Sequence, residues 1–83
     1  MRYNELKKQM EKLGFQTHLT PFGDIDVYNK DPRFVATIDR GYQLRINLRG
    51  SLLTEFQQPN GKRAFEIMIE YARTPIADRR DET

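Results

Sequence analysis

Apolar positions near the start of the chain recur with the period of an α-helix. Their spacing by three and four residues predicts a helix over residues 2–13 with good helix formers on its polar face. One stripe of this helix carries Tyr3, Leu6, Met10 and Leu13. Gly14 follows the last apolar position, so we expect the helix to end there, with Phe15 folding back onto it.

The middle of the chain alternates between apolar and polar residues, which is the period of a strand with one buried face. Residues 24–29 and the segment that runs from Arg33 to residue 38 form the first such pair, with Asn29-Lys-Asp-Pro32 as a four-residue loop, so that Tyr28 lies opposite Arg33. The predicted register places Val27 opposite Phe34, because that pairing puts Phe34, Ala36 and Ile38 on one face and leaves Val35 on the other.

A third alternating segment covers residues 42–49 and follows Asp39-Arg40-Gly41. We expect a three-residue turn with Gly41 in the left-handed conformation, so that Ile38 faces Tyr42. The apolar side chains of this third segment then lie on the same face as Ile38, and they are Tyr42, Leu44, Ile46 and Leu48. Residues 15–20 are also expected to be extended, as a short extra strand.

A second helix is predicted over residues 62–73, after a turn at Pro59-Asn60-Gly61. Its apolar face is assigned to Ala64, Phe65, Met68, Ile69 and Ala72, broadened by Ile67 and Tyr71. The pattern of residues 51–58 leaves helix, strand and loop open. Residues 78–83 have little to bury and are expected to fray, which gives a single domain over residues 1–77.

Together these elements predict an α+β domain. It consists of an N-terminal helix, a three-stranded antiparallel meander with the short extra strand at 15–20, and a C-terminal helix. Both helices are expected on one face of the sheet, because the other face is polar.

Composition narrows the function classes. The 83 residues include 14 Lys and Arg against 12 Asp and Glu, so the chain lacks the clear basic excess of a non-specific nucleic-acid binder. There is no Cys, hence neither a disulfide nor a thiolate metal site. No apolar run reaches the roughly 18–20 residues of a membrane span, and no signal peptide is evident. We therefore expect a cytoplasmic protein without a membrane partner.

The chain offers little for catalysis, cofactor binding or metal binding. His18 is the only histidine and has no Cys or second His as a partner, so we expect an exposed or strand-edge residue. Asp24 and Asp26 resemble the start of a calcium loop, but neither the glycine nor the closing glutamate follows. We predict that the protein is not an enzyme.

The polar sheet face is the predicted contact surface. Its expected members are Tyr28, Val35, Thr37, Arg45, Asn47 and Arg49. A protein partner is the leading interpretation, bound through this face or through an open strand edge, and a homodimer by strand-edge or sheet-face pairing is also possible. Asp26 lies diagonal to Arg45 in this register, which offers a surface ion pair as the structural interpretation of the charges.

Nucleic-acid binding is the alternative function, through the arginines Arg33, Arg40, Arg45 and Arg49.

Four apolar residues lie in predicted loops, where they either close the ends of the core or contact a partner. These are Phe22, Leu52, Leu53 and Phe56.

Two segments, residues 24–38 and 69–79, together with the opening helix resemble small uncharacterised proteins of phages and prophages of Gram-positive bacteria. The shared features are a helix, two strands around a turn, and a helix that ends in an Ala-x-Thr-Pro-x-x-x-Arg-like tail, here Ala72 to Arg79. The resemblance implies an accessory phage protein that binds a partner in the host cytoplasm, and it brings no catalytic residues.

Overall fold

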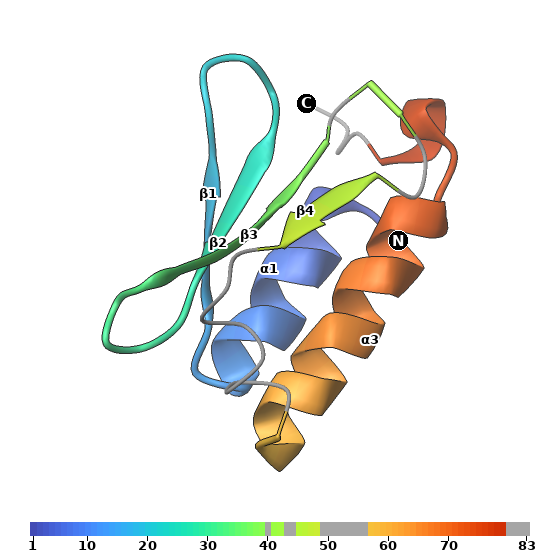
Figure 1. Ribbon diagram of the computed structural model, residues 1–83. Coiled ribbons are helices and arrows are strands. Elements are labelled where there is room, and N and C mark those ends of the chain that lie inside the picture. Colours follow the sequence, from blue (N-terminus) through green and yellow to red (C-terminus); the bar gives the residue numbers. More distant parts are fainter. Residues whose placement is uncertain (40, 43–44, 49–56, 80–83) are drawn as a thin grey trace.

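Two helices lie side by side on one face of a four-stranded antiparallel sheet (Figure 1). This is a computed structural model that describes residues 1–39, 41–42, 45–48 and 57–79. The strands follow one another in the sheet in the order β1-β2-β3-β4. The elements are α1 (Tyr3–Lys12), β1 (Gln16–Leu19), β2 (Ile25–Tyr28), β3 (Phe34–Ile38), β4 (Ile46–Leu48), α3 (Pro59–Arg73) and the short 3₁₀ helix η1 (Ile76–Asp78). The predicted α+β class is confirmed, and the extra strand expected at 15–20 is β1.

The end of α1 follows the local signals in the sequence. Gly14 has a left-handed φ of 88°, and its N–H donates to the Glu11 carbonyl over 3.0 Å. The N–H of Phe15 donates to the Met10 carbonyl, also over 3.0 Å. This pair of bonds closes the last turn and directs Phe15, only 5% exposed, back under the helix.

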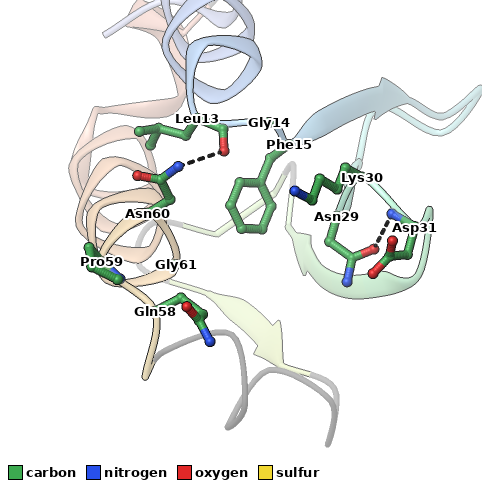
Figure 2. Close-up of a pocket in the computed structure, with 10 residues that line it drawn as sticks. All are labelled: Leu13, Gly14, Phe15, Asn29, Lys30, Asp31, Gln58, Pro59, Asn60 and Gly61. Carbon is green, nitrogen blue, oxygen red and sulfur yellow. Dashed lines mark hydrogen bonds between the residues drawn. The ribbon is translucent and has the colours of Figure 1, made fainter.

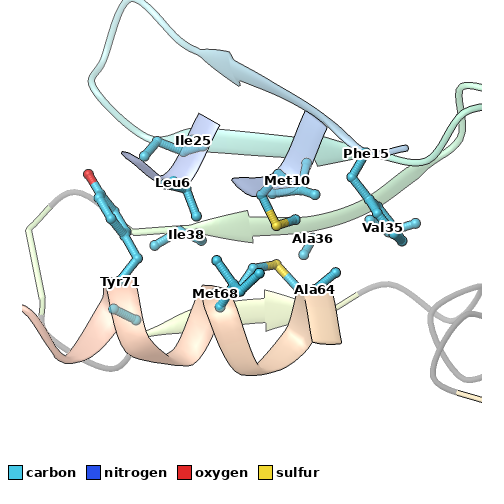
Figure 3. Close-up of a cluster of buried hydrophobic side chains, with 13 residues drawn as sticks. Leu6, Met10, Phe15, Ile25, Val35, Ala36, Ile38, Ala64, Met68 and Tyr71 are labelled. Atoms are coloured by element: carbon cyan, nitrogen blue, oxygen red, sulfur yellow. The ribbon is translucent and has the colours of Figure 1, made fainter. Parts of the chain in front are cut away.

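The core fills the space between the helices and the sheet (Figure 3). Leu6 and Met10 of α1 are fully buried. On α3 the buried stripe is rotated from the predicted one, since Phe65 and Ile69 are only half-buried. The buried side chains of α3 are Ala64, Ile67, Met68, Tyr71 and Ala72. Ile67 and Tyr71, predicted only to broaden this face, are thus part of the buried stripe.

The register of β2 and β3 differs from the predicted one. Val27 pairs with Ala36 rather than with Phe34, and Ile25 pairs with Ile38. A bulge interrupts the ladder between Val27 and Tyr28, so Val35 is the extra residue on β3. The expectation that Val35 lies on the polar face is wrong, because its side chain is 0% exposed.

The turn between β3 and β4 is longer than the three-residue turn predicted. Ile38 pairs with Ile46, and the N–H of Asp39 donates to the Arg45 carbonyl over 2.9 Å. Gly41 is not in the left-handed conformation, and Tyr42 is 62% exposed instead of facing Ile38. The Asp39 carboxylate accepts the Gly41 N–H over 2.7 Å, which stabilises the wider turn. Leu44 lies outside the described residues.

Helix α3 begins three residues earlier than predicted. Pro59 occupies the first turn, where its fixed φ fits and its missing N–H costs nothing. Asn60 and Gly61 therefore belong to the helix and not to a preceding turn. Residues 51–56 lie outside the described part of the chain, so the open assignment of 51–58 is settled only for Gln57 and Gln58, which precede the helix.

Arg79 belongs to the packed domain, although the frayed tail was expected from Asp78. Its side chain is only 5% exposed. The guanidinium donates to the carbonyls of Thr74, Ala72 and Asp39 over 3.0, 2.7 and 2.9 Å. The Arg79 carbonyl accepts the Tyr3 N–H over 3.2 Å, so this residue ties the C-terminal segment to both α1 and β3.

Candidate functional site

The sheet face opposite the helices presents two rows of side chains. Cross-strand partners share a face, so the register defines each row. The first row crosses three strands as Gln16, Tyr28 and Phe34. The second row crosses all four strands as His18, Asp26, Thr37 and Asn47. We call these seven residues the open face.

An aromatic pair occupies the middle of the first row. The ring centroids of Tyr28 and Phe34 are 5.4 Å apart, and the ring planes are tilted by 33°. Both side chains are half-buried. The bulge at Val35 causes this arrangement, because one extra residue on β3 turns Phe34 to the face opposite Ala36.

Sequence reasoning assigned Phe34 to the core and so missed half of this pair. The signal was the run Phe34-Val35-Ala36, since three consecutive apolar residues cannot all share a face in strict alternation. Without packing information, either Phe34 or Val35 could have been the residue turned outward.

The second row is held by hydrogen bonding between strands. The Thr37 hydroxyl donates to the Asp26 carboxylate over 3.0 Å. The predicted Asp26–Arg45 pair is replaced by a pair between Arg45 and Asp39, with 3.7 Å between Nε and Oδ2. The Arg45 guanidinium also lies 5.0 Å from the centre of the Tyr42 ring, so both its contacts are at the β3–β4 turn.

The predicted contact residues that the structure describes therefore fall into three groups. Tyr28, Thr37 and Asn47 lie on the open face, whereas Val35 is buried. Arg45 is exposed beside the turn. Arg49 lies outside the described residues. Of the arginines in the nucleic-acid alternative, Arg33 is exposed in the loop before β3, and Arg40 is not among the described residues.

A shallow hollow of about 460 Å³ lies beside the aromatic pair. It is lined by Gln16, Thr17, His18, Tyr28 and Pro32. His18 is exposed on the edge strand, as expected for a histidine without catalytic partners. The hollow extends the open face towards the edge at β1 and offers an imidazole and an amide next to an aromatic ring.

A second hollow lies where the end of α1, the β2–β3 loop and the start of α3 meet (Figure 2). Two of its polar side chains, Asn29 and Asn60, form hydrogen bonds with backbone groups. The Asn29 carbonyl oxygen Oδ1 accepts the N–H groups of Asp31 and Arg33 over 3.0 and 2.7 Å. Asn60 Nδ2 donates to the Leu13 carbonyl over 3.4 Å. These contacts shape the loop and connect the helices.

Exposed apolar side chains lie at the ends of the sheet. Phe22, in the β1–β2 turn, is 75% exposed and therefore does not close the core. Leu19 and Leu48, on the two edge strands, are 50% and 47% exposed. The other loop residues in question, Leu52, Leu53 and Phe56, lie outside the described residues.

Among the described residues, no group of three or more His, Asp or Glu side chains is placed to hold a metal ion. Over the same residues, neither α1 nor α3 has the length and apolar character of a membrane-spanning helix.

No family model, curated protein or solved structure matches this chain. The geometry of the open face is thus the basis for a functional hypothesis.

Proposed function

We propose that this protein is a small non-enzymatic interaction module that binds a protein partner through the open face. The observation that carries the proposal is the Tyr28–Phe34 pair, which the strand register places on the sheet face opposite both helices. Aromatic side chains contribute much of the binding energy of protein interfaces, because they bury a large area with few rotatable bonds.

The polar row supports a protein as the partner. Asp26 and Thr37 are already bonded to each other, and Asn47 stands beside Thr37 on the next strand. This row offers oriented donors and acceptors around the aromatic pair, and it includes a carboxylate. A carboxylate on the contact surface fits a partner of mixed charge better than a polyanion.

The resemblance to phage and prophage proteins supports a more specific role. On this basis the chain is an accessory protein of phage origin that acts by binding a partner in the cytoplasm of a bacterial host. Such a role requires a contact surface and no catalytic group.

Nucleic-acid binding is the second candidate, and the aromatic pair also favours it. Two aromatic rings on neighbouring strands can stack with unpaired bases, and exposed Arg33 could contact a phosphate. This candidate predicts binding of a single-stranded oligonucleotide at low salt that weakens steeply as salt is raised. Absence of binding at low salt would exclude it.

The test compares two tyrosines that differ in position. Tyr28 lies on the open face, and Tyr42 is exposed in the β3–β4 turn. Immobilised wild-type protein, Tyr28→Ala and Tyr42→Ala are each incubated with bacterial lysate, with and without nuclease. We expect capture of a defined protein that survives nuclease, is lost with Tyr28→Ala and is kept with Tyr42→Ala.

Two results would contradict the proposal. Equal capture by Tyr28→Ala and the wild type would show that the open face is not the contact surface. Loss of all capture after nuclease treatment would favour the nucleic-acid candidate. Circular dichroism of both variants checks that neither substitution unfolds the protein.

A further inference from the structure

We propose that strand β1 pairs with strand β1 of a second copy of this chain, which makes the protein a homodimer with one continuous sheet. This surface is the edge of the sheet and is distinct from the open face. β1 is the first strand in the sheet order, and no described residue pairs with its outer edge (Figure 1).

The pairing of β1 with β2 identifies which backbone groups point outward. The Thr20 N–H donates to the Asp24 carbonyl over 2.8 Å, which marks a hydrogen-bonded position of the ladder. In an antiparallel ladder these positions alternate, so His18 is the next hydrogen-bonded residue. Thr17 and Leu19 lie between these positions and direct their N–H and C=O groups away from β2.

The available edge has defined ends. The Phe15 N–H already donates to the Met10 carbonyl, and Pro21 has no N–H to donate. Only Thr17 and Leu19 therefore offer both a donor and an acceptor along this edge. Two residues separated by one position match the spacing of hydrogen-bonded sites in a second antiparallel strand.

One two-fold register uses all of these groups. Thr17 pairs with Leu19 of the second copy, and Leu19 pairs with Thr17 of the second copy, which gives four backbone hydrogen bonds. His18 then lies on the two-fold axis and faces its own symmetry mate at a non-hydrogen-bonded position. Shifting the register by two residues in either direction would require the Phe15 N–H or the missing N–H of Pro21.

The side chains of β1 permit pairing with an identical strand. Edge strands of natural proteins are commonly protected by charged residues, proline or bulges. The sequence Gln16-Thr-His-Leu19 contains no Pro. It also contains no Asp, Glu, Lys or Arg, although these four residue types make up 31% of the chain. Pairing with a second copy places no like carboxylates or ammonium groups opposite each other, and it covers Leu19, which is 50% exposed.

The first experiment measures mass against concentration by sedimentation equilibrium. We expect the wild type to shift from 9.9 kDa towards twice this mass as concentration rises. Leu19→Pro removes an outward N–H and leaves the bonds to β2 intact, so it should raise the dissociation constant at least about tenfold. Leu19→Val keeps the N–H and should dimerise like the wild type.

The second experiment measures the register by cross-linking, because the natural chain has no Cys. Residues facing each other at a non-hydrogen-bonded position have Cα atoms about 4.5 Å apart, within disulfide range. His18→Cys should therefore form a covalent dimer under mild oxidation. Gln16→Cys lies on the same face, but its symmetry mate would be roughly 14 Å away along the strand, so it should not.

Three outcomes would overturn the proposal. A wild type that stays at 9.9 kDa up to millimolar concentration would show that this edge does not pair with a second copy. Equal dimerisation of Leu19→Pro and Leu19→Val would place the contact elsewhere. Cross-linking of Gln16→Cys in preference to His18→Cys would exclude the register. Circular dichroism confirms that each variant is folded.

Discussion

The ring of Phe34 packs against the ring of Tyr28 on the open face, with 5.4 Å between the centroids. This contact exists because the bulge at Val35 places Val35 and Ala36 in the core together. Without the extra residue, Phe34 would point towards the helices. A single local irregularity of β3 thus decides whether the open face carries one aromatic residue or two.

The first prediction concerns the direction of Val35. Val35→Ser leaves a cavity and a buried hydroxyl, so we expect the free energy of unfolding to fall by about 2–4 kcal/mol. Thr37→Ser, two positions along on the open face, keeps its hydroxyl and should change stability by less than about 1 kcal/mol. Urea denaturation of both variants measures this difference. Similar losses for the two would place Val35 outside the core.

A second prediction tests the end of α1. Gly14→Ala meets no atom within 4 Å, but it forces a β-carbon into a left-handed backbone conformation with φ of 88°. The expected loss of stability is about 1–2 kcal/mol. Gly41→Ala is the control, because Gly41 is not left-handed and its nearest contact, Asp39 Oδ1, is at 3.5 Å. Thermal unfolding should show destabilisation for Gly14→Ala alone.

A third prediction uses the N-terminus of α3, where stability can be gained. Gln58 occupies the N-cap position with extended backbone angles, but its side chain makes no capping hydrogen bond. The first turn also contains no acidic residue. Gln58→Asp should supply the missing cap and raise the free energy of unfolding by about 0.5–2 kcal/mol. Gln57→Asp adds the same charge without the cap and should gain less.

A fourth prediction concerns Arg79 as the link between the C-terminal segment and the sheet. Burial lowers the pKa of its guanidinium, and the neighbouring Tyr71 and Asp39 oppose this shift. Arg79→Ala leaves three backbone carbonyls without this donor, so we expect a loss of about 2–4 kcal/mol. Arg63→Ala, which removes an exposed ion pair with Glu66, should cost less than about 0.5 kcal/mol. Equal losses in guanidinium denaturation would contradict the proposed role of Arg79.

Several features governed by nearby residues were predictable from the sequence. The helix α1, its end at Gly14 and the return of Phe15 depend on apolar spacing and on one glycine. The alternation of Ile25 and Val27 likewise predicted the face of β2 correctly. These signals were sufficient for the α+β class and for the side of the sheet that carries the helices.

Features governed by packing between distant residues were not predictable. Whether Phe34 or Val35 is buried depends on the space left beneath the helices, which alternation alone does not report. The burial of Arg79 contradicts the usual exposure of arginine, and it depends on the carbonyls of Ala72 and Asp39 converging around the side chain. The error at Phe34 and Val35 affected the candidate site, and the error at Arg79 affected the domain boundary. Each of these features depends on how one side chain packs.

The most direct test of this account is a nuclear Overhauser effect measurement on the aromatic and methyl protons. The structure predicts cross-peaks between the rings of Phe34 and Tyr28, and cross-peaks from the Val35 methyl groups to protons of the buried cluster. Cross-peaks from Phe34 to Leu6 or Met68, with none to Tyr28, would contradict it. Phe34 would then belong to the core, and the aromatic pair on which the proposed function rests would be absent.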